Sequence, residues 1–120
     1  MKIAGIGFRD EASLVAVLDA LARAGAVGVR HLALPERKRG HPLCDQLRAH
    51  GFTLDFIADV ALAATQTPTQ SPVARRHYGT GSVAEAAALA ALPGARLAAP
   101  RALSADRMAT AALALTGDPV

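Results

Sequence analysis

Apolar residues recur along the chain in two alternating patterns, one typical of strands and one typical of helices. Residues 2–8 form a short apolar run with small residues between two isoleucines, which predicts a strand that ends in a turn. Leucine and valine then repeat at helical spacing over residues 14–21, between a serine suited to cap the helix, Ser13, and a helix-ending glycine, Gly25. The chain therefore begins with a strand that leads directly into a helix.

The same alternation continues through the middle of the chain. Apolar runs at residues 29–34 and 52–57 predict two more strands, and residues 42–50 predict a helix between them. Strands and helices that alternate in this way pack as layers, with helices on both faces of a largely parallel sheet. We therefore expect an α/β fold, a single three-layer α/β/α sandwich with a mostly parallel sheet of about five strands.

The second half of the chain contains shorter elements. A short helix is predicted at residues 59–64, and another at residues 72–78 with Ser71 as its cap and Pro72 in its first turn. An alanine-rich helix follows Ser82. Because alanine strongly favours helix and has a small side chain, this helix is expected to be slender and able to lie close to a sheet.

The chain is predicted to end in an antiparallel hairpin. Residues 96–99 and 108–115 have strand-like patterns, and the connection between them is too short for a parallel crossover. A length of 120 residues fits one domain, so we expect residues 1–120 to form a single unit.

The composition narrows the classes of partner. A net charge of +3 and a pI near 9.8 favour an anionic partner, but the 13 Lys and Arg residues are scattered and aromatic residues make up only 3%, which disfavours nucleic acid. The single cysteine excludes an internal disulfide, and the histidines lack metal-ligand spacing, so no metal and no cofactor are expected. The N-terminus meets charge too soon for a signal peptide or a membrane span, so we expect a cytoplasmic protein without membrane contact.

The turn Gly7-Phe8-Arg9 is the first candidate for anion binding. It follows the first strand, and open α/β sheets bind ligands at the carboxyl ends of their strands. Gly7 would let the backbone approach a ligand that Arg9 faces. A dinucleotide is disfavoured, because Asp10 stands where the glycine-rich fingerprint requires its third glycine.

Thr80-Gly81-Ser82, at the start of the alanine-rich helix, is the second candidate. Hydroxyl groups, a glycine and free backbone N–H groups at a helix start suit a carboxylate or phosphate. Ser82 and Glu85 also have the spacing of a capping box, which satisfies the helix start without any ligand. The two interpretations are compatible, and both stay open.

Arg37, Lys38, Arg39 and His41 form the densest basic cluster. Such a run is most often a solvated loop, but it follows the second strand and would lie on the same sheet edge as Arg9, where it could join an anion site. No Gly-x-Ser-x-Gly elbow or ordered catalytic triad is present, so no catalytic residue is identified.

Two segments carry a resemblance to a known family. They are Gly5-Ile6-Gly7-Phe8-Arg9 with Ala12-Ser13, and Thr80-Gly81-Ser82-Val83-Ala84-Glu85 with the alanines behind it. Similar residues occur at 67–68, at 71–73 and in the closing hairpin. The chain resembles the CobE/CbiG C-terminal domain family of cobalamin biosynthesis over almost its whole length, in the form of its free-standing members.

This resemblance implies a role in corrin-ring assembly. Precorrin intermediates are macrocycles with several acetate and propionate carboxylates, and a basic domain with donor-rich loops suits them. The resemblance implies a ligand site formed by Gly7, Phe8, Arg9, Ser13, Thr80, Gly81, Ser82, Glu85 and Arg101.

Three hypotheses follow from the implied role. The first is a non-catalytic protein of the aerobic route that binds or carries a precorrin or a macrocycle of the hydrogenobyrinic acid type. The second is a hydrolase-like enzyme that opens the precorrin lactone with loss of a two-carbon fragment, with Glu85 or His77 as general base. The third is a structural partner of another corrin enzyme. We favour the first.

Overall fold

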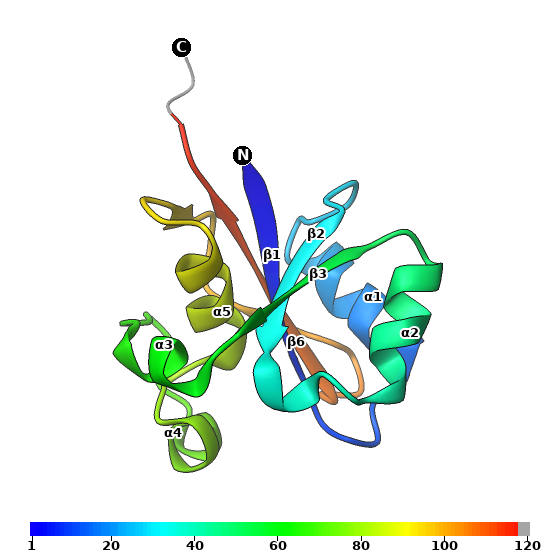
Figure 1. Ribbon diagram of the computed structural model, residues 1–120, viewed down its shortest axis with the longest axis horizontal. Coiled ribbons are helices and arrows are strands. Elements are labelled where there is room, and N and C mark those ends of the chain that lie inside the picture. The colour runs from blue at the N-terminus through cyan, green and yellow to red at the C-terminus, as the bar shows by residue number, and fades with distance from the viewer. Residues whose placement is uncertain (118–120) are drawn as a thin grey trace.

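The computed structural model describes residues 1–117 as three layers, a six-stranded sheet between two groups of helices (Figure 1). The elements in chain order are β1 (Lys2–Phe8), α1 (Leu14–Arg23), β2 (His31–Pro35), the short 3-10 helix η1 (Glu36–Lys38), α2 (Pro42–Ala49), β3 (Thr53–Ile57), α3 (Asp59–Ala64), α4 (Pro72–Tyr78), α5 (Val83–Ala91), β4 (Arg96–Leu97), β5 (Ala102–Leu103) and β6 (Ala109–Leu115). Helices α1 and α2 cover one face of the sheet, and α3 and α5 cover the other. Residues 118–120 of the expected domain lie outside the described residues.

The strand order of the sheet is β3-β2-β1-β6-β4, and β5 also pairs with β6. β1, β2 and β3 are mutually parallel, whereas β6 is antiparallel to β1, to β4 and to β5. Every strand except β6 therefore points the same way. The predicted three-layer sandwich with a mostly parallel sheet and a C-terminal antiparallel hairpin is confirmed. No helix in this part of the chain is long and apolar enough to cross a membrane.

The sixth strand, β5, is not predicted by the sequence pattern. β4 pairs with the end of β6 at Leu115, whereas β5 pairs with its beginning at Thr110. Pro100 lies between β4 and β5, and proline has no backbone N–H to donate to a ladder. The strand expected at residues 96–99 is thus shorter than predicted, at Arg96–Leu97, and the separate strand Ala102–Leu103 follows Pro100. The other predicted boundaries agree to about two residues, the usual uncertainty at element ends.

Alternate residues of β1 contact opposite helical layers. Ala4, Ile6 and Phe8 belong to the core beneath α1 and α2, whereas Ile3 belongs to the core beneath α3 and α5. This period of two is the pattern expected of a strand that is covered on both faces.

Helix α5 lies so close to β1 that its backbone rests on Gly5. A Cβ atom at Gly5 would be 1.9 Å from the carbonyl oxygen of Ala84 and 2.7 Å from the backbone nitrogen of Ala88. Both alanines are fully buried, and their small side chains allow the helix to approach this closely. The glycine in the strand and the alanines in the helix therefore form one complementary contact.

We expect the substitution G5A to destabilise the protein, because the added methyl group would overlap backbone atoms of α5 that cannot rotate away. The free energy of unfolding, measured by urea denaturation, should fall by about 3 kcal/mol. G40A is the matched control, because a Cβ atom at Gly40 would meet nothing within 4 Å. Equal stability of the G5A and G40A variants would contradict the close packing of α5 on β1.

Candidate anion-binding cleft

A cleft of about 210 Å³ opens at the C-terminal end of β1. Its walls come from the end of β1, from α4, from the first turn of α5, from β5 and from the turn at residues 104–108. Four of the residues predicted to bind a ligand border it, namely Gly7, Phe8, Arg9 and Arg101. The cleft therefore lies where α/β sheets commonly bind ligands, at the carboxyl end of a strand.

The cleft carries positive charge that no acidic side chain of residues 1–117 neutralises. Arg9, Arg101 and Arg107 border it together with His77, and none of the lining residues is acidic. None of these three arginines takes part in an ion pair within the described part of the chain. Their guanidinium groups are therefore free to form charge-assisted hydrogen bonds with an anion.

The basic cluster at residues 37–41 is engaged in internal contacts instead. Arg37 Nε lies 2.8 Å from a carboxylate oxygen of Asp59, and Arg37 Nη1 donates to the carbonyl oxygen of His77 at 2.7 Å. The same guanidinium lies over the ring of Tyr78, 4.5 Å from its centroid. Helix α4 has no buried residue, so these contacts hold it beside the sheet edge. This cluster does not border the cleft, but it positions the helix that forms one of its walls.

Glu85 is fully buried, and its carboxylate joins two loops near the cleft. Oε1 accepts a hydrogen bond from the backbone N–H of Thr69 at 2.9 Å, and Oε2 accepts one from the Thr69 hydroxyl at 2.7 Å. Oε2 also accepts from the backbone N–H of Arg101 at 2.7 Å. Both oxygens of Glu85 are occupied by these hydrogen bonds. Glu85 therefore holds the loops of Thr69 and Arg101 in place and does not border the cleft.

The predicted capping box is confirmed in one half and wrong in the other. Ser82 Oγ accepts a hydrogen bond from the backbone N–H of Glu85 at 3.3 Å, as an N-cap should. The Glu85 side chain does not complete the box, because its carboxylate is directed at Thr69 and Arg101. Spacing of three residues identified the cap, but it carries no information about partners distant in the sequence.

The other predicted ligand residues lie outside the cleft lining. Thr80 and Ser82 are buried at the start of α5. Gly81 makes room for the neighbouring loop, because a Cβ atom there would be 2.3 Å from the carbonyl oxygen of Thr69. Ser13 caps α1, its Oγ accepting from a backbone N–H of the first turn at 3.2 Å. The segment 80–82 therefore packs beneath the loops that shape the cleft.

The turn at residues 104–108 brings to the cleft a residue that the sequence pattern did not single out, Arg107. Because β6 pairs with β1, this turn lies beside the end of β1, and the backbone N–H of Arg9 donates to the carbonyl oxygen of Met108 at 2.9 Å. Arg9 and Arg107 lie at opposite ends of the chain, so only the pairing of β6 with β1 shows that Arg107 borders the same cleft.

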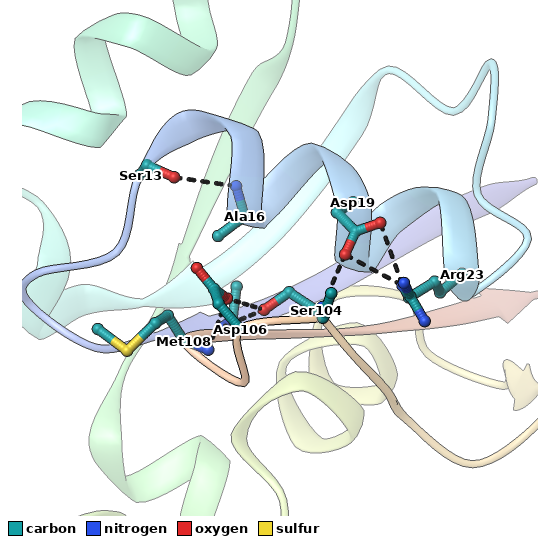
Figure 2. Close-up of polar contacts among 9 residues, drawn as sticks. Ser13, Ala16, Asp19, Arg23, Ser104, Asp106 and Met108 are labelled. Atoms are coloured by element: carbon teal, nitrogen blue, oxygen red, sulfur yellow. Dashed lines mark hydrogen bonds and ion pairs between the residues drawn. The ribbon is translucent and has the colours of Figure 1, made fainter.

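Two aspartates fasten this turn (Figure 2). Asp19, on α1, accepts a hydrogen bond from the backbone N–H of Ala105 at 2.8 Å, and Asp106 accepts one from the Ser104 hydroxyl at 2.6 Å. Asp106 also accepts from the backbone N–H of Met108 at 3.0 Å. The hydrogen bond from Ala105 lowers the pKa of Asp19, and the hydrogen bond from Ser104 lowers the pKa of Asp106.

These features define a small α/β domain with a cationic cleft at one edge of its sheet, and known proteins are similar to it in sequence and fold. The family model described as "Cobalamin synthesis G C-terminus" matches residues 2–114. The crystal structure of CobE, a protein from the cobalamin (vitamin B12) biosynthetic pathway, is 36% identical with a TM-score of 0.81, over 99% of this chain and 93% of that chain. The cobalamin biosynthesis protein chiG from Agrobacterium tumefaciens is 34% identical with a TM-score of 0.69, over 98% of this chain and 100% of that chain. No curated protein sequence matches the chain.

The chain belongs to the CbiG C-terminal family of cobalamin biosynthesis proteins. The resemblance noted in the two glycine-containing segments is thereby confirmed, and the match extends through β1, α5 and β6.

We expect E85Q to lower the free energy of unfolding by about 2 kcal/mol, measured by urea denaturation. The buried carboxylate accepts three hydrogen bonds from Thr69 and Arg101, and a glutamine amide would set an N–H group against at least one of these donors. The control is E36Q, because Glu36 is 56% exposed and its ion pair with Arg39 spans 3.9 Å. Wild-type stability of E85Q would contradict the anchoring role of Glu85.

The hydrogen bonds that Asp19 and Asp106 accept from the turn should make the free energy of unfolding depend on pH in the acidic range. Asp19 and Asp106 have folded-state pKa values below the ordinary value of 3.8, so their stabilising contribution is present above that pH and is lost as the pH falls through the lowered values. The double variant D19N/D106N should therefore lose less stability than the wild type between pH 5 and about pH 2 in urea titrations. D45N serves as the control, since the Asp45 side chain is 93% exposed. Identical pH dependence of the double variant and the wild type would rule out these anchors.

Proposed function

We propose that this protein binds a polycarboxylate corrin intermediate at the cleft and acts as its carrier. The observation that carries the proposal is the group of arginines at the cleft, Arg9, Arg101 and Arg107, which border it without an acidic partner in the described residues. Membership of a cobalamin biosynthesis family supplies the class of ligand, because precorrins carry several acetate and propionate groups around one ring.

The lining of the cleft suits both parts of such a molecule. Arginines can bind the peripheral carboxylates, and each charge-assisted hydrogen bond contributes about 1.5 to 3 kcal/mol. Val73, Val83, Leu103 and Met108 supply apolar surface for the edge of the ring. Positive charge beside apolar surface is the combination that an amphipathic, polyanionic macrocycle requires.

The size of the cleft favours a carrier over an enclosing enzyme. Pockets that enclose a small-molecule ligand usually measure about 300 to 1,000 Å³, and this cleft measures about 210 Å³. It is therefore suited to hold one edge of a macrocycle and to leave the remainder accessible. A ligand held by one edge can be passed to another protein without complete release into water.

The alternative function, opening of the precorrin lactone with loss of a two-carbon fragment, needs a general base at the cleft. His77 borders the cleft from α4 and is the better placed of the two candidates, because Glu85 is fully buried and hydrogen-bonded to both loops. Incubation of the purified protein with the lactone intermediate separates the two functions. Release of acetaldehyde by the wild type, and its loss in H77A, would replace the carrier function with the hydrolase function.

We expect titration with hydrogenobyrinic acid to change the absorption spectrum of the macrocycle and to saturate. R9A and R101A should each raise Kd about tenfold, because each removes one charge-assisted contact. R76A is the control, because Arg76 is exposed on α4 and does not border the cleft. The absence of any spectral change with the wild type, or an equal loss of affinity in R76A, would refute binding at this cleft.

A further inference from the structure

We infer that Arg107 is a ligand-binding residue that makes the cleft selective for carboxylates, and that the turn carrying it maintains an unfavourable backbone conformation for this purpose. The inference rests on the proposed function, because it names a residue of the same cleft. It adds a residue that neither the sequence motifs nor the family resemblance assigns.

The backbone of Arg107 is in the left-handed region, with φ at 62°. Among the described residues it is the one non-glycine residue with a positive φ. A side chain with a Cβ atom is disfavoured in this region, whereas glycine is tolerated freely and asparagine more readily than arginine. Backbone stability alone would therefore select glycine or asparagine at this position.

The surrounding turn holds Arg107 in this conformation from several sides. Its backbone N–H donates to the carbonyl oxygen of Ser104 at 2.9 Å, and the backbone N–H of Ser104 donates to the carbonyl oxygen of Ala109 at 2.9 Å. Asp19 fixes the next residue of the turn, Ala105, to α1 (Figure 2). The side chain of Arg107 therefore projects from a backbone that is fixed before any ligand binds, which lowers the entropy lost on binding.

The electrostatic surroundings leave the Arg107 guanidinium available. The charged and titratable groups that share the cleft with it are Arg9, Arg101, His77 and Tyr78, and none of them is a carboxylate. In residues 1–117 no side-chain hydrogen bond or ion pair involves Arg107, so its side chain has no internal structural role there. A costly conformation without an internal contact to stabilise is the pattern expected of a residue retained for binding.

The two loops that carry Arg9 and Arg107 are joined directly. The backbone N–H of Arg9 donates to the carbonyl oxygen of Met108, the residue after Arg107, at 2.9 Å. Two guanidinium groups from adjoining loops can engage neighbouring carboxylates on the rim of one macrocycle. A ligand whose carboxylates are converted to uncharged amides or esters would lose both contacts.

The test replaces Arg107 with residues that fit its backbone better. We expect R107G and R107N to melt at or above the temperature of the wild type, but to bind hydrogenobyrinic acid about tenfold more weakly and with a shallower dependence on salt. R107K retains the charge but not the planar fork of the guanidinium, so it should lose less affinity than R107G and R107N. R76A again controls for the removal of a positive charge from outside the cleft.

Selectivity is measured with a stable stand-in for the corrin ring, an octacarboxylate porphyrin, and with its neutral methyl ester. The wild type should bind the acid and discriminate strongly against the ester. R107G should reduce the ratio of the two Kd values about tenfold. Wild-type affinity and selectivity in R107G would overturn this inference and leave the proposed function intact. A lower melting temperature of R107G and R107N would show that Arg107 stabilises the turn and would also overturn it. Failure of the wild type to bind any of these macrocycles would overturn the proposed function itself.

Discussion

The contact between the backbone of α5 and Gly5 of β1 is the constraint on which the site depends. Because Gly5 has no side chain and α5 presents alanines, the helix lies directly on the sheet, and the first turn of the helix is buried. Glu85 lies on that turn and is fully buried. From this position its carboxylate reaches Thr69 and Arg101, two residues on loops that are otherwise unrelated. The close contact between α5 and β1 thus fixes the position of Glu85, and Glu85 holds both loops.

The carboxylate of Glu85 accepts hydrogen bonds from uncharged donors only, so it does not occupy a guanidinium group of the cleft. A buried carboxylate is tolerated when its oxygens accept hydrogen bonds, and here two backbone N–H groups and one hydroxyl supply them. Arg101 contributes its backbone to Glu85, so its guanidinium remains free of that carboxylate. The neighbouring cations Arg37 and Lys38 are paired with Asp59 and Asp10. Acidic residues therefore neutralise the basic cluster beside the cleft and leave the charge of the cleft itself for a ligand.

The sequence was sufficient to predict the layers of the fold because its signals there are local. Apolar periodicity located β1 and α1, and Ser71 with Pro72 marked the start of α4, where the structure places a side-chain cap. The two-residue strand β5 is too short to show any periodicity, and its pairing with β6 depends on contacts made elsewhere in the sheet.

The candidate site was predicted only in part, because local sequence signals do not show which distant segments the fold brings together. Gly7, Phe8 and Arg9 were predicted because they end the first strand at the binding edge, and Arg101 was predicted because the family resemblance implies it. The segment from Thr80 to Ser82 has the composition of an anion site, but α5 packs so deeply that these residues are buried. Arg107 could not be identified without the pairing of β6 with β1, because a turn residue with positive φ carries no sequence signature when it is arginine.

We propose that the arginines at the end of β1, which have no acidic partner in residues 1–117, form the contact surface for a polycarboxylate macrocycle. A crystal structure of the complex with hydrogenobyrinic acid tests it most directly. We expect one edge of the ring in the cleft, with its carboxylates within hydrogen-bonding distance of Arg9, Arg101 and Arg107. A macrocycle bound against another face of the domain, with these three guanidinium groups uncontacted, would contradict it.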